Sequence, residues 1–266
     1  MPAVSDTVTV AATPDTAWEE RTDVPVLAER EVHVWRVPLS ASPAAVARAS
    51  QLLDDGETAR VASLARPELK VRQILSFALL RVLLARYLYI QPQGVLLRQR
   101  PTGKPYLCGN AAVAEVRFNL AHSGDMALYA ITTHAEIGVD IEQRRPLHDF
   151  ASMIETVLTP AERSIIRSMP TENQLPVFMD AWTLKEAYLK ATGEGIAGLS
   201  AVEAILGLRD GEPVFGLRAA STENLPPWTV RLLDPVAGYS AAVVVLAAFG
   251  AFRQFALRPD VWLQQS

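Results

Sequence analysis

Short turns between strand-like runs are the feature that most restricts the fold of this 266-residue chain. Ser123-Gly124-Asp125 separates the runs 115–121 and 126–132, and Asp210-Gly211 separates a second such pair. Turns this short join antiparallel neighbours, because a parallel pair needs a crossover of a dozen or more residues. The sequence therefore predicts antiparallel hairpins in both halves of the chain.

Helical patterns fall between these sets of strands and do not alternate with single strands. The residue pattern predicts helices over 44–53, 74–89, 149–157, 160–169 and 174–191, and further strands over 31–39, 136–142, 228–233 and 239–246. Thr159 is a predicted N-cap, and Gly193 a predicted helix stop. Each half thus combines helices with antiparallel strands, which predicts an α+β fold and not a doubly wound parallel sheet.

Composition argues against nucleic-acid-binding, disulfide-linked and membrane-spanning classes of protein. Half of the residues are hydrophobic, which allows a sizeable core, and the net charge of −4 argues against a general nucleic-acid partner. One cysteine excludes an internal disulfide. Residues 1–25 show no periodicity and no basic-then-apolar targeting pattern, so they are interpreted as a flexible leader. The longest apolar run, 239–252, is too short to span a bilayer. We therefore expect a cytoplasmic protein without a membrane partner.

The strand Ile137-Gly-Val-Asp-Ile-Glu142 carries the clearest chemical signal. Side chains alternate along a strand, so Asp140 and Glu142 share one face while the apolar residues face a core. Two such carboxylates suit a hard cation such as magnesium, manganese or calcium. A solvated polar face is the alternative for this strand. Gly138 favours the functional interpretation, because a strand glycine often marks close approach of a ligand or of backbone.

The helix Trp182-Thr-Leu-Lys-Glu-Ala-Tyr-Leu-Lys190 offers a third carboxylate and two cations. Glu186 and Lys190 lie four residues apart on one helix face, which is also the pattern of an exposed Glu–Lys pair. His122 ends a strand, at a position from which an imidazole reaches a phosphate or ribose. The chain lacks a P-loop, a dinucleotide-binding glycine motif and a nucleophile elbow. Cations around three carboxylates fit the binding of a metal-bridged pyrophosphate.

Three segments also resemble a known family. FNLAHSG at 118–124, IGVDIE at 137–142 and WTLKEAYLK at 182–190 are similar, in this order, to the signatures of Sfp-type 4′-phosphopantetheinyl transferases. Gly103-Lys104-Pro105 occupies the place of that family's GKP turn. The resemblance implies two similar α+β subdomains in a pseudo-two-fold arrangement, 26–136 and 137–266, with coenzyme A bound between them.

The resemblance also implies roles for individual residues. Asp140, Glu142 and Glu186 match the family's magnesium-binding carboxylates, with manganese as an alternative metal. Lys185 and Lys190 match lysines that contact the coenzyme A phosphates.

A second set of matches concerns the nucleotide end of coenzyme A. Lys104 and His122 match residues around the 3′-phosphate and the pyrophosphate. Arg60 and Arg72 match, by a looser alignment, cations near the 3′-phosphate and adenine. The chain departs from the family where Ala121 replaces a serine that many members carry. It departs again where Glu57 replaces a lysine that some members carry.

The activity implied is transfer of 4′-phosphopantetheine from coenzyme A to a serine of an apo acyl, peptidyl or aryl carrier protein, by a monomer. Glu186 is the predicted base, directly or through a metal-held water, with Lys190 assisting the leaving phosphate; Glu162 is the next choice of base. Two alternatives remain open from the residues: another metal-dependent phosphoesterase, and a non-catalytic module that binds coenzyme A or a carrier.

Overall fold

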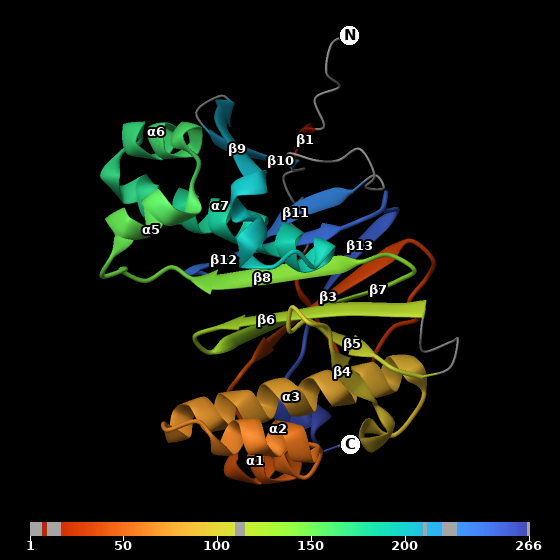
Figure 1. The fold of residues 1–266 in the computed structure, drawn as a ribbon. Helices are drawn as coiled ribbons and strands as arrows, with labels where there is room; N and C mark the ends of the chain where they lie inside the picture. Colours follow the sequence, from red (N-terminus) through yellow and green to blue (C-terminus); the bar gives the residue numbers. More distant parts are fainter. Residues whose placement is uncertain (1–6, 10–16, 110–114, 210–211, 220–227, 265–266) are drawn as a thin grey trace. The chain divides into compact units, whose positions relative to one another are not determined.

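The computed structural model describes residues 7–9, 17–109, 115–209, 212–219 and 228–264, and Figure 1 shows its helices and strands. Two compact units of mixed helix and strand form the chain. Residues 17–134 together with 250–266 are called the N-terminal unit. Residues 135–249, together with the segment before residue 17, are called the C-terminal unit. The fold class is α+β, as predicted.

The N-terminal unit is built on a five-stranded sheet. Its strands, in spatial order, are β2 (Glu19–Glu20), β13 (Ala251–Ala256), β3 (Glu31–Pro38), β7 (Met126–Thr133) and β6 (Val116–Ser123). Its helices are α1 (Pro43–Ser50), α2 (Asp55–Ala62), α3 (Pro67–Leu88) and α8 (Pro259–Trp262), with the 3-10 turn η1 (Pro92–Gly94). A small hairpin joins β4 (Leu97–Gln99) to β5 (Pro105–Leu107). The long helix α3 buries its apolar face in one core with Trp35, Tyr129 and Trp262.

Two parts of the N-terminal unit differ from the predictions. Strand β13 pairs in parallel with β3 and β2, so residues 250–266 belong to this unit and not to the predicted subdomain 137–266. Residues 17–25 are not a loose leader. Trp18 lies 5.3 Å from the Arg36 guanidinium, and the Arg21 carbonyl accepts a 2.7 Å hydrogen bond from Trp262. Both differences depend on contacts between residues far apart in sequence.

The C-terminal unit contains two three-stranded sheets. One orders β11 (Thr229–Leu233), β12 (Tyr239–Val245) and β8 (Ile137–Gln143), and the other orders β1 (Thr7–Thr9), β10 (Glu212–Ala219) and β9 (Val202–Arg209). Helices α5 (Phe150–Val157), α6 (Pro160–Ser168) and α7 (Thr171–Thr192), with the 3-10 segment η2 (Ile196–Ala201), complete it. Strands β9 and β10 are antiparallel as predicted, and the Asp210-Gly211 turn lies outside the described residues.

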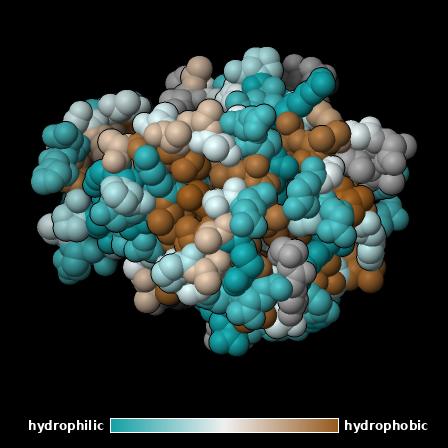
Figure 2. Space-filling model, turned by 90° about the horizontal axis from the view of Figure 1, so that it is seen from below, coloured by the Kyte–Doolittle hydropathy of each residue, from teal (hydrophilic) through white to brown (hydrophobic). Residues whose placement is uncertain are grey.

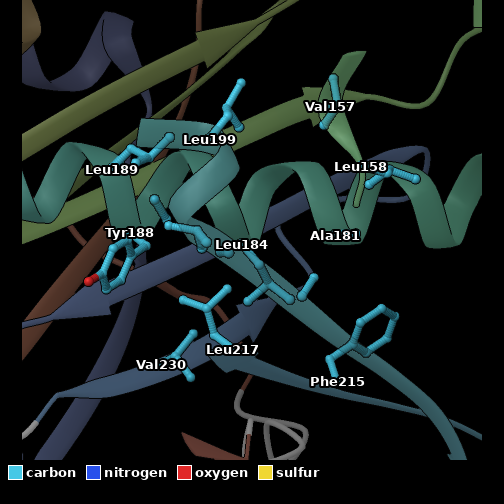
Figure 3. Packing of buried hydrophobic residues seen from close by; sticks show 14 of the residues in the cluster. Val157, Leu158, Ala181, Leu184, Tyr188, Leu189, Leu199, Phe215, Leu217 and Val230 are labelled. Atoms are coloured by element: carbon cyan, nitrogen blue, oxygen red, sulfur yellow. The ribbon is translucent and has the colours of Figure 1, made fainter. Parts of the chain in front are cut away.

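Helix α7 is the centre of this unit. Figure 3 shows Leu184 and Tyr188 of α7 on the side of the helix that faces Leu217 and Val230. These side chains belong to one buried cluster, and burial of each stabilises the unit by about 1.5–3 kcal/mol. The helix ends at the predicted stop, because Gly193 adopts a left-handed φ of 80°.

Large apolar side chains exposed by the described residues include Val26, Tyr89, Leu96 and Tyr106. On the face drawn in Figure 2, brown apolar side chains lie among teal polar ones. Among the helices of the described residues, none combines the length and the apolar character that crossing a bilayer requires.

Candidate active site

Helix α7 lies directly on strand β8 at Gly138. A Cβ atom at this position would lie 2.0 Å from the Ala187 carbonyl oxygen and 2.4 Å from the Ala191 nitrogen. Glycine is therefore required because the backbone of a helix approaches this strand, which is one of the two interpretations of a strand glycine. The close approach brings the polar face of β8 to the helix face that carries Glu186 and Lys190.

Asp140 is the most buried carboxylate at this contact. The residue is 4% exposed, and its Oδ1 accepts a 2.6 Å hydrogen bond from the Lys190 ammonium. Its Oδ2 is buried and has no hydrogen-bond partner among the described residues. Burial raises the pKa of the Asp140 carboxyl, while the charge of Lys190 opposes the rise. A buried acceptor atom without a donor is one that a cation satisfies.

Glu186 is a second carboxylate near Asp140. Its Oε1 is likewise buried without a hydrogen-bond partner in the described part of the chain. Burial raises the pKa of Glu186, and the negative charge of Asp140 raises it further, while Lys190 lowers it. Asp140 and Glu186 therefore repel each other electrostatically across a shared lysine. Two unsatisfied carboxylate oxygens in one place fit a hard divalent cation.

Glu142 does not join this pair as predicted. It lies on the same face of β8 two residues beyond Asp140, and it is only half-buried. Among the described residues, no group of three or more Asp, Glu, His or Cys side chains is arranged to hold a metal ion. The expected set of three carboxylates is thus not preassembled. In this structure the positive charge nearest to Asp140 belongs to Lys190.

Lys185 has a different environment from the one that the resemblance implies. Its side chain is fully buried, and its Nζ donates to the Val157 carbonyl at 2.9 Å and to Glu162 at 3.0 Å. Glu162 is also buried, and it accepts backbone N–H bonds from Thr159 and Ala204. The burial and internal pairing of Lys185 therefore do not support its predicted contact with coenzyme A, and the pairing of Glu162 does not support its role as the alternative base. Together the two side chains link α6 to α7 and, through the Ala204 N–H, to β9.

The buried position of Lys185 has a signal in the sequence. Ala181 and Tyr188 lie four residues before and three residues after it, so Lys185 falls on the apolar stripe of the helix. A lysine on such a stripe is expected to be paired internally, because an unpaired buried ammonium is costly.

A cavity of about 670 Å³ lies within the N-terminal unit. It is lined by Asp54, Gly56, Glu57, Arg60, Gln73, Phe77, Leu80, Leu97, Arg98, Gln99, Gly103, Pro105, Leu120 and His122. These residues come from α2, α3, the β4–β5 hairpin and β6. The volume falls in the range of pockets that bind small organic ligands.

The cavity gathers part of the predicted coenzyme A-binding set. Arg60 and His122 line it, and Lys104 lies between the two lining residues Gly103 and Pro105. Arg72 does not line it, and its guanidinium instead bonds to Asp125 at 2.5 Å.

Two arginines at the cavity were not singled out from the sequence. Arg98 lines the wall formed by β4, and Arg81 lies buried beside the wall formed by α2. The available signal was Arg81 itself, an arginine inside the apolar run Ala78–Ala85 of α3, which requires acidic partners.

Comparisons with known proteins agree with this arrangement. Residues 136–244 match the model of the 4′-phosphopantetheinyl transferase superfamily, and residues 39–134 match the model of a 4′-phosphopantetheinyl transferase N-terminal domain. The 4′-phosphopantetheinyl transferase HetI of Nostoc sp. is 36% identical over 83% of this chain and 89% of that protein.

Other relatives match over a shorter stretch. The 4′-phosphopantetheinyl transferase psf-1 of Bacillus pumilus is 32% identical over 55% of this chain and 60% of that protein. A crystal structure of Thermotoga maritima holo-[acyl-carrier-protein] synthase is 23% identical with a TM-score of 0.33, covering 42% of this chain and 62% of that one. The match to HetI extends over both units, and the chain belongs to the 4′-phosphopantetheinyl transferase superfamily.

Proposed function

We propose that this chain transfers the 4′-phosphopantetheine group of coenzyme A to a serine of an apo carrier protein, with Mg²⁺ as its metal. The observation that carries the proposal is the pair of buried, unsatisfied oxygens, Asp140 Oδ2 and Glu186 Oε1. They lie within the stretch that matches the superfamily model. Asp140, Glu142 and Glu186 would hold the metal, which when bound neutralises negative charge on the pyrophosphate.

In the reaction, the serine oxygen forms a bond to the β-phosphorus of coenzyme A. The bond from that phosphorus to the bridging oxygen breaks, and adenosine 3′,5′-bisphosphate leaves. Glu186, the carboxylate one helical turn before Lys190, takes the serine proton. The half-exposed ammonium of Lys190, held by Asp140, contacts the leaving phosphate.

The nucleotide end of coenzyme A binds in the cavity of the N-terminal unit. Arg60 and His122 line the cavity, and Lys104 is next to it, so cationic and imidazole groups are available for a phosphate. Arg72 is not included in this proposal, because its guanidinium is already bound to Asp125.

The test is transfer of a fluorescent coenzyme A to apo acyl, aryl and peptidyl carrier proteins in the presence of MgCl₂. We expect covalent labelling of the carrier serine, its loss on addition of EDTA, and its recovery with Mg²⁺ or Mn²⁺. Binding of coenzyme A without labelling of any carrier would instead identify a binding module. Hydrolysis of phosphodiesters without a carrier would identify a phosphoesterase, and either result refutes the proposal.

A further inference from the structure

The cavity of the N-terminal unit contains two acids that would repel a phosphate. Asp54 and Glu57 both line it, at the start of α2. Both carboxylates bind the guanidinium of Arg81, Asp54 through Nη2 and Glu57 through Nε at 2.7 Å. Arg81 is 3% exposed and the Glu57 side chain is 13% exposed, so their bond is shielded from water, whereas the Asp54 side chain is 50% exposed and its charge is partly screened. The single positive charge of Arg81 thus offsets one of the two negative charges in this part of the cavity wall.

Helix α2 depends on these polar bonds for its position. None of its side chains is buried, so no apolar core holds it. Its first turn is a capping box, in which the Glu57 N–H donates to Asp54 at 2.8 Å and the Asp54 N–H donates to Glu57 at 3.0 Å. The same two carboxylates bind Arg81, so the capping box and the ion pairs form one network. Arg60 lies one turn further along α2, so the position of its backbone depends on this network.

Arg81 also holds the opposite wall. Its Nη1 donates a 2.9 Å hydrogen bond to the carbonyl of Val95, two residues before β4 begins. Strand β4 carries Arg98, which lines the cavity and forms no ion pair within the described part of the chain. One buried side chain therefore binds both segments that present an arginine to the cavity.

We infer that Arg81 is a positioning residue that selects the 3′-phosphate of coenzyme A, with Arg98 as an additional phosphate-binding side chain. Arg81 offsets part of the acidic charge, and Arg60 and Arg98 on two walls supply further positive charge, which makes the cavity a receptor for a phosphate monoester. The inference rests on the proposed function and adds to it a source of selectivity for coenzyme A over 3′-dephospho-coenzyme A.

The test compares KM for coenzyme A and for 3′-dephospho-coenzyme A in wild type and in Arg81→Gln. We expect KM for coenzyme A to rise about ten- to a hundredfold, the effect of losing a charge-assisted bond and leaving acids unpaired. KM for the dephospho substrate and kcat should change less than about threefold, so the selectivity ratio falls. Calorimetric titration with adenosine 3′,5′-bisphosphate and with adenosine 5′-monophosphate gives the same comparison without transfer.

Further variants keep the inference testable if Arg81→Gln does not fold. Arg81→Lys keeps the charge but not the planar fork, and should lose an intermediate part of the selectivity. Arg98→Gln changes an exposed side chain and should raise KM for coenzyme A alone. Arg48→Gln is the control, because Arg48 is a half-buried arginine of α1 that bonds to the Leu263 carbonyl at 3.0 Å, away from the cavity lining.

The outcomes separate the two proposals. A wild-type protein that binds no coenzyme A would overturn both. Normal binding and transfer by the wild type, with the selectivity ratio unchanged in Arg81→Lys and Arg98→Gln, would overturn only the inference about Arg81. A fall in selectivity equal to that of Arg48→Gln would also overturn it, because a general loss of stability would then explain the effect.

Discussion

Gly138→Ala is the sharpest test of how closely α7 packs on β8. The new Cβ would lie 2.0 Å from the Ala187 oxygen, about 1 Å nearer than real Cβ contacts allow. The atoms it meets belong to the helix backbone, so no side-chain rotation relieves the contact and α7 must move away from β8. Overpacking of this kind destabilises a protein by about 1–3 kcal/mol, and more where backbone must shift. We expect about 3 kcal/mol, which lowers Tm by roughly 6–12 °C.

The same displacement should reduce activity beyond the loss of stability. A shift of about 1 Å separates Glu186 and Lys190 from Asp140, and misplacement on this scale reduces rates by about a hundredfold. The assays are thermal and urea unfolding, followed by the transfer rate measured well below Tm. Gly94→Ala is the control, because its Cβ would lie 3.7 Å from the Ile90 Cδ1 and meet no backbone. A Gly138→Ala protein with wild-type Tm and transfer rate would refute the close helix–strand contact.

Four further predictions follow from the buried charges. Glu186→Gln should lower kcat by about a hundredfold or more while retaining or raising Tm, because it removes the base and a repulsive carboxylate; near-normal turnover would exclude Glu186 as the base. Mg²⁺ at about a hundred times its Kd should stabilise wild type by about 2.7 kcal/mol, measured by thermal unfolding, and this effect should disappear in Asp140→Asn. Lys185→Met should lower the free energy of unfolding by about 3–5 kcal/mol, because Glu162 stays buried without its cation, while KM for coenzyme A measured well below Tm stays unchanged. Burial lowers the pKa of His33 from its ordinary 6.5 to about 4. The free energy of unfolding therefore has its full value above pH 6.5 and falls by up to about 3 kcal/mol as the pH drops toward 4, because the unfolded chain binds the proton first. Chemical denaturation across this pH range should show a smaller fall in the free energy of unfolding for His33→Gln than for wild type.

Local sequence determined most of the elements of this protein. Turn residues placed the β6–β7 hairpin, Thr159 and Glu162 formed the predicted capping box, and Gly193 ended α7. Each of these interactions joins residues at most a few positions apart, so the residues alone specify it. Alternation along a strand and the helical period likewise placed Asp140 on one face of β8 and Glu186 on α7 beside Lys190.

Only the tertiary structure decided which of these groups meet. Strand β13 joins β3 across more than two hundred residues of sequence, and no local pattern marks that partner. The fold also decides which partner each lysine of α7 finds: Lys185 is bound to Glu162 in the core, whereas Lys190 binds Asp140 where α7 packs on β8. Arg81, in the middle of the apolar helix α3, binds both Glu57 of α2 and the Val95 carbonyl before β4. Such contacts depend on how helices pack on sheets, since a buried charge is stable only where the fold brings it a partner.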